Sequence, residues 1–244
     1  TGCRVGEIYH GGYSQLAKVN KDFLIKKPNN ISTRESMVMG TAGFTALLCA
    51  LAINAREALL LGEKVNEVLV TGATGGVGSV AVMALTKMGY NVTAVTGKPE
   101  NTELLKKLGA KNVINRSEFE GEPKLLGKAI WDGVVDTVGG NVLAHAISQT
   151  KHSGIVAACG NAGGVKLNTN VMPFILRGVK LWGIDSIQVS MKRREFVWSQ
   201  VEKLIDFKIL EELVQVLSLD GIINIFPEML KGQTSGRIIV DVNK

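Results

Sequence analysis

The amino-acid sequence predicts an α/β fold in which a doubly wound parallel sheet is covered by helices. Short runs rich in β-branched residues alternate with helical patterns, at intervals of roughly 20 residues, over much of the chain. A glycine-rich turn separates the first of these runs from the helix that follows it. The chain has 244 residues, 45% of them hydrophobic and 20% charged, and is long enough to bury such a core.

The elements follow from the spacing of apolar residues. Residues 1–28 contain short apolar pieces between glycines, which predicts short antiparallel strands and turns. From Ser32 a helical stripe indicates a long buried helix. The stripe consists of Phe44, Leu47, Leu48, Leu51, Ala55 and Leu59.

The alternating region begins after this helix. The predicted strands are 67–71, 92–96, 112–115, 133–138 and 154–159. The predicted helices between them are 76–88, 101–108, 123–130 and 140–150. Right-handed crossovers make such a sheet doubly wound. After Pro173 we expect a strand at 179–185, helices at 192–205 and 224–231, and a closing strand at 236–242.

Composition and charge narrow the classes of partner. The net charge is +6, and the basic residues are dispersed, with Lys192-Arg193-Arg194 as the longest cluster. We therefore expect small anionic ligands and no nucleic acid. Cys3, Cys49 and Cys159 are too widely spaced for a disulfide framework or a zinc site, and indicate free thiols in the cytoplasm. No apolar run reaches about 18 residues, so no membrane span is expected.

The stretch VLVTGATGGVGSVA, from Val68 to Ala81, has the order strand, turn, helix. Such a turn presents backbone N–H groups at a helix N-terminus, where a pyrophosphate is favoured. Gly75 lets the backbone approach the phosphates, and Gly78 permits close packing of helix against strand. Ala73 takes the first position of the G-x-G-x-x-G fingerprint. We expect a dinucleotide site of the Rossmann type, and the alternative is a tight turn without a ligand.

Within this turn, cofactor contacts are expected at Thr74, Gly75, Gly76 and Val77. The end of the second strand indicates which dinucleotide is bound. An acid there selects NAD through the ribose 2′-hydroxyl, whereas this chain has Thr96-Gly97-Lys98 and no acid before Glu100.

A hydroxyl and a cation suit a 2′-phosphate, so NADPH/NADP+ is the expected cofactor. Arg116, at the end of the third strand, is a candidate second cation for that phosphate. An ordinary surface position is the alternative for Lys98 and for Arg116.

The turn also fits the T-G-x-x-x-G-x-G pattern of short-chain dehydrogenases, which need a Tyr-x-x-x-Lys pair for proton transfer. Tyr9, Tyr13 and Tyr90 are followed four residues later by Tyr13, Ala17 and Ala94. Because no lysine follows at that spacing, the short-chain interpretation fails.

The arrangement instead resembles the medium-chain dehydrogenase/reductase superfamily. The stretches that carry the resemblance are GGYSQLAKVNKDFLIKKP, GTAGFTALL, ATGGVGSVA, LLKKLGAKNVINR and VVDTVGG. More narrowly, four stretches are similar to the quinone oxidoreductase-like branch that contains NADPH-dependent acryloyl-CoA reductases. These are VMGTAGFTALLC, VTGATGGVGSVAV, VAACGNAGG and VMPFILRGVKLWGIDS, of which the last two are the most specific.

The resemblance covers essentially the whole chain and implies two domains. An NADP-binding Rossmann domain is expected at 41–186, and a partial GroES-like, β-rich catalytic domain at 1–40 and 187–244. Proteins of this family carry a further segment before the point matching Thr1, so catalytic residues within that segment stay unassigned. The chemistry implied is hydride transfer from nicotinamide to the β-carbon of an α,β-unsaturated carbonyl, without zinc.

The resemblance and the strand ends suggest further cofactor contacts. Thr41 is expected to face the nicotinamide, with a helix-capping hydroxyl as the alternative for Thr41 and for Thr45. Backbone contacts are expected at the carboxyl end of the fifth strand. The residues there are Cys159, Gly160 and Ala162.

The strand at 179–185 resembles the family's dimer-forming edge strand, so we expect a homodimer. Ile184 and Ser186 follow it near the nicotinamide half, and Arg237 is a candidate for a phosphate or substrate contact. For Lys192-Arg193-Arg194 a solvated helix face is favoured over attraction of a CoA phosphate.

Three functions remain open from the sequence. The preferred one is an NADPH-dependent reductase of an enone or acyl-CoA substrate such as acryloyl-CoA. An NADPH:quinone oxidoreductase is the first alternative, and a non-enzymatic NADPH-binding sensor or inactive subunit is the second.

Overall fold

A parallel sheet of six strands forms the centre of the fold. The computed structural model describes residues 2–59 and 66–244. The strands are β1 (Glu67–Val70), β2 (Asn91–Thr96), β3 (Asn112–Asn115), β4 (Trp131–Asp136), β5 (Thr150–Ala158) and β6 (Lys180–Gly183). Their order across the sheet is β3-β2-β1-β4-β5-β6, and every neighbouring pair is parallel. The predicted α/β fold is confirmed, and each predicted strand of the sheet is present.

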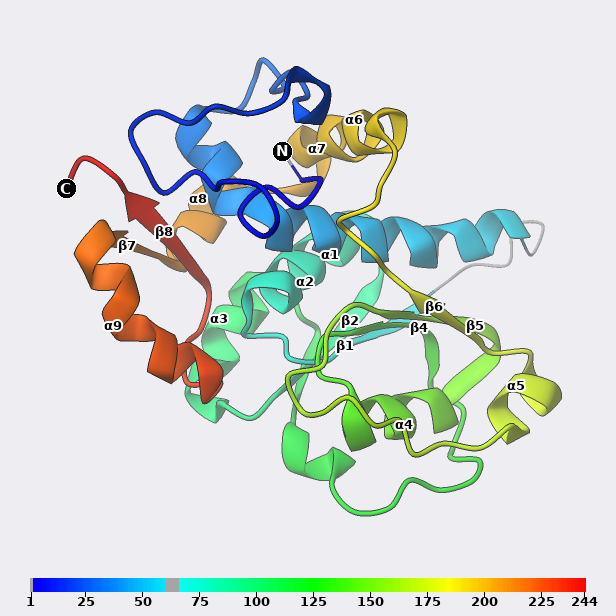
Figure 1. Ribbon diagram of the computed structural model, residues 1–244. Helices are drawn as coiled ribbons and strands as arrows, with labels where there is room; N and C mark the ends of the chain where they lie inside the picture. The colour runs from blue at the N-terminus through cyan, green and yellow to red at the C-terminus, as the bar shows by residue number, and fades with distance from the viewer. Residues whose placement is uncertain (1, 60–65) are drawn as a thin grey trace.

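Helices cover both faces of this sheet. They are α1 (Thr33–Leu59), α2 (Gly76–Lys87), α3 (Thr102–Lys107), α4 (Gly140–Ser148) and α5 (Met172–Arg177), with single 3-10 turns η2 (Pro99–Asn101) and η3 (Arg116–Phe119). Figure 1 shows α1 and α2 on one face and α4 on the other. The alternation predicted from the sequence therefore gives a doubly wound sheet.

The helix predicted at 123–130 is wrong, because these residues form an irregular segment. Pro123 and Gly127 disfavour a helix here. The N–H of Gly127 donates to the carbonyl of Ser148, and its carbonyl accepts from the Arg177 guanidinium at 2.6 Å. Leu125 is exposed, so the segment has no apolar stripe to bury.

The antiparallel strands predicted within 1–28 are also wrong. Among residues 2–28 the structure shows an isolated bridge between Val5 and Tyr9 and the 3-10 turn η1 (Lys21–Phe23). Cys3 and Arg4 have positive φ angles of 54° and 63°, which turn the chain instead of extending it.

The C-terminal region forms a second, smaller sheet. Its elements are α6 (Met191–Ser199), α7 (Val201–Leu204), α8 (Phe207–Glu211), β7 (Val214–Ser218), α9 (Leu219–Leu230) and β8 (Arg237–Asp241). The predicted helices and closing strand are confirmed, with α9 beginning earlier than expected because the Ser218 hydroxyl caps it at Gly221 N. Strand β7, which pairs with β8 in parallel, is not predicted from the sequence.

Helix α1 is the core helix of the protein. Within the described residues, its segment Thr33–Arg56 is long and apolar enough to cross a membrane, which corrects the expectation that no such run exists. In the structure 67% of its tested 18-residue apolar stretch is buried inside the protein. A buried core helix can be as long and as apolar as a membrane span. The helix is kinked at Gly40, where φ is 48° and ψ is −156°.

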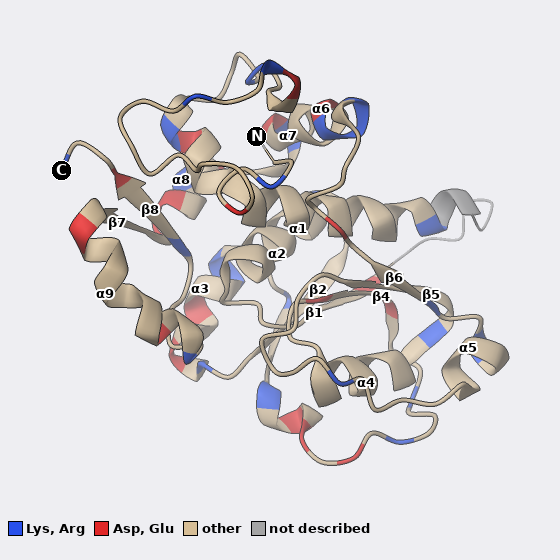
Figure 2. Ribbon diagram, in the orientation of Figure 1, with Lys and Arg blue, Asp and Glu red and all other residues tan. Residues whose placement is uncertain are grey.

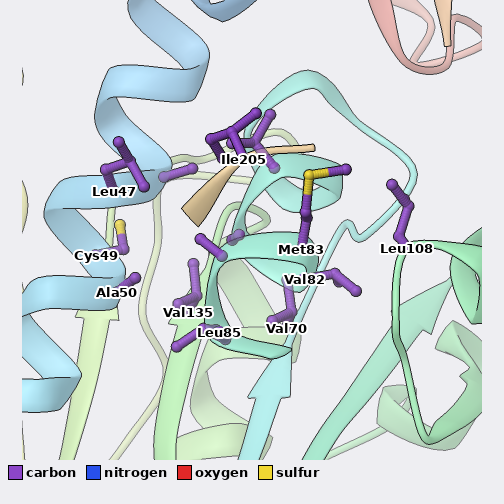
Figure 3. Close-up of a cluster of buried hydrophobic side chains, with 14 of the residues drawn as sticks. Leu47, Cys49, Ala50, Val70, Val82, Met83, Leu85, Leu108, Val135 and Ile205 are labelled. Carbon is purple, nitrogen blue, oxygen red and sulfur yellow. The ribbon is translucent and has the colours of Figure 1, made fainter. Parts of the chain in front are cut away.

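Side chains of α1 and α2 pack together over the sheet. Figure 3 shows Leu47, Cys49 and Ala50 of α1 in a cluster with Met83 of α2 and Val135 of β4. The predicted stripe of α1 is confirmed, since Phe44, Leu47 and Leu48 are buried. Leu51 and Ala55 are half-buried, and the side chain of Leu59 lies outside the described residues.

Gly78 brings α2 into direct contact with the glycine turn. A Cβ at Gly78 would overlap the carbonyl oxygen of Gly72 and lie 2.7 Å from Cα of Ala73. Because the obstructing atoms belong to the backbone, a side chain here must displace the helix from the turn. The sequence assigns Gly78 to close packing of the helix against the strand, and the structure shows this close contact with the turn that follows β1.

Replacing Gly78 with alanine therefore destabilises the fold. We expect Gly78→Ala to lower the free energy of unfolding by about 2 kcal/mol, the steric term outweighing the gain in helix propensity. Gly12→Ala is the control, because nothing lies within 4 Å of its Cβ position. Urea unfolding followed by circular dichroism measures both variants, and equal stability of Gly78→Ala and wild type contradicts the account.

Candidate dinucleotide site

The candidate site lies at the carboxyl ends of β1 and β4. These strands are neighbours, yet the chain leaves β1 toward α2 and β4 toward α4, on opposite faces of the sheet (Figure 1). This is the topological switch point at which such sheets bind ligands. Gly75 is the N-cap of α2, and no side chain caps the helix there. The first backbone N–H groups of α2 are therefore suited to bind an anion.

The turn itself brings Thr74, Gly75, Gly76 and Val77 to the start of α2, as expected. A Cβ at Gly75 would have only the Gly72 carbonyl oxygen nearby, at 3.3 Å, so the space beyond Gly75 is open. A Cβ at Gly76 would lie 2.5 Å from Nη1 of Arg237. Gly76 thus makes room for a guanidinium that lies against the turn.

Arg237 joins this turn to the kink of α1. Its Nε donates to the carbonyl of Val38 at 2.7 Å, and its Nη2 donates to that of Met39 at 3.2 Å. These carbonyls end the first half of α1, and the guanidinium occupies the position of a helix C-cap. Burial lowers the pKa of Arg237 from its ordinary value. The sequence leaves Arg237 as a candidate for a phosphate or substrate contact or as a surface arginine, and the structure places it beside Gly76.

The end of β2 is attached to the turn through two hydroxyls. Oγ1 of Thr96 lies 3.4 Å from Oγ1 of Thr74 and accepts from the backbone N–H of Lys98 at 3.0 Å. Both threonines are buried. Lys98 Nζ donates to the carbonyl of Thr234 at 2.6 Å, and burial lowers the pKa of this ammonium.

Arg116 lies over Gly97. A Cβ at Gly97 would be 3.2 Å from Cζ of Arg116, whose side chain is exposed. Arg116 also lines a cavity of about 350 Å³ together with Val138 and Gly139 from the end of β4. The structure therefore brings together Thr96, Gly97, Lys98 and Arg116 as the sequence predicts, and their cofactor role stays a prediction.

Asp136 is a residue of the site that is not predicted from the sequence. Its fully buried carboxylate accepts from the Thr71 hydroxyl at 2.6 Å and from the N–H of Gly139 at 2.8 Å. The Thr71 oxygen in turn accepts from the N–H of Thr137 at 3.1 Å. An acid that ends a run of buried apolar residues, as in GVVD, is the signal that points to such a role.

The residues after β5 lie against those after β4. Cys159 N donates to the carbonyl of Asp136 at 2.9 Å, and a Cβ at Gly160 would overlap the carbonyl of Thr137. The Cys159 thiol, together with burial, raises the pKa of the Cys49 thiol. Cys159 and Gly160 are thus at the carboxyl edge of the sheet as predicted, and Ala162 follows on the surface.

A second cavity, of about 320 Å³, lies on the other side of the α1 kink. It is lined by Thr41 and Ser186, two of the residues predicted near the nicotinamide, and by Phe44 and Met37 of α1. Ile184 is half-buried behind it, with its N–H bonded to the carbonyl of Ala158 at 2.8 Å. The capping alternative for Thr45 is wrong, because its hydroxyl donates to the carbonyl of Thr41 at 2.7 Å, one helical turn earlier, and so does not cap a backbone N–H.

The expectation of a solvated face for Lys192-Arg193-Arg194 is wrong for Arg194, which is 2% exposed. Its guanidinium lies 4.6 Å from the ring centroid of Phe44 and donates to the carbonyls of Ser186 and Ile187. Periodicity along α6 does not show this, because the partners come from α1 and from the segment after β6. Lys192 and Arg193 are exposed, as expected.

The described residues contain no group of three or more His, Cys, Asp or Glu side chains arranged to hold a metal ion. The cations and hydroxyls of the site instead suit an elongated anionic ligand. The predicted residues form a continuous row. It begins at Lys98, passes along the glycine turn to Arg237, and ends at Gly40, which lines the cavity together with Thr41.

The buried Asp136 carboxyl makes stability depend on pH. Burial raises its pKa above the ordinary 3.8, against the hydrogen bonds from Thr71 and Gly139 that lower it. The folded protein therefore holds this proton more tightly than the unfolded chain. The contribution to stability is complete below the ordinary value and is lost as the pH rises through the raised pKa.

Asp136→Asn tests this assignment, because the amide accepts only one of the two hydrogen bonds. We expect it to lower the free energy of unfolding by about 1–3 kcal/mol near neutral pH. The difference between wild type and variant should grow as the pH falls through the raised pKa toward the ordinary value of 3.8. Urea unfolding across that range measures it, and a difference that shrinks toward acid pH contradicts the assignment.

Comparison with known proteins identifies the family of this chain. The zinc-binding dehydrogenase family matches residues 76–206. The acrylyl-CoA reductase AcuI of Ruegeria pomeroyi is 44% identical over 244 residues, which are 100% of this chain and 73% of the relative. The putative quinone oxidoreductase YhfP of Bacillus subtilis is 42% identical over 98% of this chain and 72% of its own length.

Solved structures give the same result. The crystal structure of Escherichia coli YhdH with bound NADPH superposes with a TM-score of 0.93 and 43% identity, covering 100% of this chain and 74% of that one. The crystal structure of YhfP has NAD bound and superposes with a TM-score of 0.91 and 42% identity, over 99% and 73% of the two chains. The chain belongs to the zinc-binding dehydrogenase family, within the medium-chain dehydrogenase/reductase superfamily that its motifs resemble.

Proposed function

We propose that this protein is an NADPH-dependent reductase that transfers a hydride to the β-carbon of an α,β-unsaturated thioester such as acryloyl-CoA. The observation that carries the proposal is the 44% identity along the whole chain with an acrylyl-CoA reductase. The site is consistent with it, because a glycine turn for a pyrophosphate and a separate cavity for a reacting group lie on either side of Arg237.

The proposed cofactor contacts divide into three groups. Thr74, Gly75, Gly76, Val77 and Arg237 would hold the pyrophosphate, where backbone N–H groups and a cation are available. The 2′-phosphate end comprises Thr96, Gly97, Lys98 and Arg116. The nicotinamide half comprises Thr41, Cys159, Gly160, Ala162, Ile184 and Ser186.

When bound, NADPH supplies the hydride, and the protein aligns the donor and acceptor carbons and stabilises the charge that develops on the substrate oxygen. Phe44 and Met37 give the cavity an apolar wall. Arg194 fixes the carbonyls of Ser186 and Ile187, and so holds one side of the cavity in place. No catalytic residue is assigned within this chain.

Quinone reduction is the second candidate function, favoured by the identity with YhfP. It uses the same cofactor residues and differs in the pocket for the acceptor. The further alternative is a protein that binds NADPH without turnover, and an assay of NADPH oxidation distinguishes it from both reductases.

We also propose a homodimer formed through β6. This strand is the exposed edge of the sheet, and its residues Leu181 and Trp182 are 38% and 39% exposed. A second copy pairing there would cover both the apolar surface and the unpaired backbone groups of the edge.

The remaining proposals concern organisation and location. We propose a nucleotide domain at 41–186 and a partial catalytic domain at 1–40 and 187–244, and the separate sheet of β7 and β8 within the latter supports this division. We propose a zinc-independent cytoplasmic enzyme without a membrane or nucleic-acid partner. The absence of a Cys-x-x-Cys set from the sequence and the dispersed charges in Figure 2 support this.

An assay of NADPH oxidation by the full-length gene product tests the function. We expect turnover with acryloyl-CoA at a kcat/KM at least about tenfold above that with a simple quinone, since an enzyme discriminates by differential transition-state binding. The reverse order overturns the acyl-CoA proposal in favour of quinone reduction. NADPH binding without turnover of either acceptor, or of any other enone, favours the sensor.

A further inference from the structure

The loop before β8 lies on the candidate cofactor turn. The N–H of Gly236 donates to the carbonyl of Thr74 at 2.8 Å. Gly236 has a φ of 69°, and a Cβ there would overlap the carbonyl of Leu213. The loop is therefore held between the turn at Thr74 and the backbone at Leu213. A segment near the C-terminus therefore forms part of the surface beside the end of β2.

This loop places a hydroxyl next to Lys98. Nζ of Lys98 donates to the carbonyl of Thr234 and, at 3.0 Å, to Oγ of Ser235. An ammonium has three N–H donors, so one remains for another acceptor. Because the Ser235 oxygen accepts from the ammonium, its own proton is directed elsewhere and can be donated to an anion. Ser235 is exposed.

Thr96 differs from Ser235 in this respect. It is 3% exposed, and its oxygen already accepts from the N–H of Lys98 and lies close to Thr74. Thr96 thus fixes the backbone from which the Lys98 side chain extends. The exposed hydroxyl near the ammonium is that of Ser235.

The cations here form no salt bridges. Within residues 2–59 and 66–244, neither Lys98 nor Arg116 forms an ion pair within 4.0 Å, and the nearby Glu100 carboxylate acts on Lys98 only through its charge. Arg116 lies over the adjoining Gly97. Two cations without a hydrogen-bonded carboxylate, together with a hydroxyl donor, match a doubly charged phosphate monoester, whose oxygens accept several hydrogen bonds.

We propose that Ser235 binds the 2′-phosphate of NADPH together with Lys98 and Arg116, and so contributes to the preference for NADPH over NADH. The inference rests on the proposed function, whose cofactor it deepens. It makes the C-terminal loop a determinant of cofactor specificity.

Two substitutions at Ser235 test the proposal by their effect on the dissociation constants of NADPH and NADH. Ser235→Ala should weaken NADPH binding by about tenfold, the loss of a hydrogen bond to a charged group. Ser235→Asp should weaken it by about 100-fold, because it places a carboxylate against the phosphate. Binding of NADH, which lacks that phosphate, should change by less than about twofold in both variants.

Ser199→Asp is the control for added charge, because Ser199 is an exposed residue of α6. Thermal unfolding establishes that each variant is folded, and if the aspartate variant is not, the alanine variant decides. Unchanged NADPH affinity, or equal weakening of both dinucleotides, overturns the role of Ser235 and leaves the proposed function standing. Wild-type protein that binds neither dinucleotide overturns both.

Discussion

The hydrogen bond between the Thr71 hydroxyl and the buried Asp136 carboxylate is the interaction on which the site depends. It joins the ends of β1 and β4, the two neighbouring parallel strands at which the order of strands across the sheet reverses. The same carboxylate fixes the N–H of Gly139, and the carbonyl of Asp136 accepts from Cys159. Three loops at the carboxyl edge therefore take their positions from one residue, although burial disfavours its charged form.

The two ends of the site are connected by close backbone approaches and one cation. Gly78 lets α2 contact the turn, and Gly76 leaves room for the Arg237 guanidinium. This guanidinium donates hydrogen bonds to the backbone carbonyls at the kink of α1. Beyond that kink Thr41 faces a cavity whose wall Arg194 supports. A ligand that spans the turn and the cavity would contact elements from both sheets, so binding and the relative position of those elements are coupled.

The sequence predicts the parts of this arrangement that have a local cause. Strands β1, β2 and β4 are buried, and strands buried on both faces of a parallel sheet are rich in continuous apolar residues, which is why they are predicted. Strand β7 and the buried Arg194 are not predicted, because each is stabilised by partners distant in sequence: β8 for the strand, and Phe44 and Ser186 for the guanidinium. At 123–130 the periodicity misleads, since Gly127 is bonded to Ser148 and Arg177. The role of Asp136 is likewise not predicted, because it depends on its hydrogen bonds with Thr71 and Gly139, and Thr71 is distant in sequence.

The central claim is that the pyrophosphate of a dinucleotide lies on the turn at Gly75. Gly75→Asp tests it most directly, because Gly75 is the uncapped N-cap of α2 with φ of −78° and ψ of 173°, where aspartate is a favoured residue. The variant should fold as well as wild type while placing a carboxylate where the phosphates bind. Isothermal titration should show NADPH affinity reduced by about 100-fold or more with no loss of thermal stability. Unchanged NADPH affinity would contradict the account.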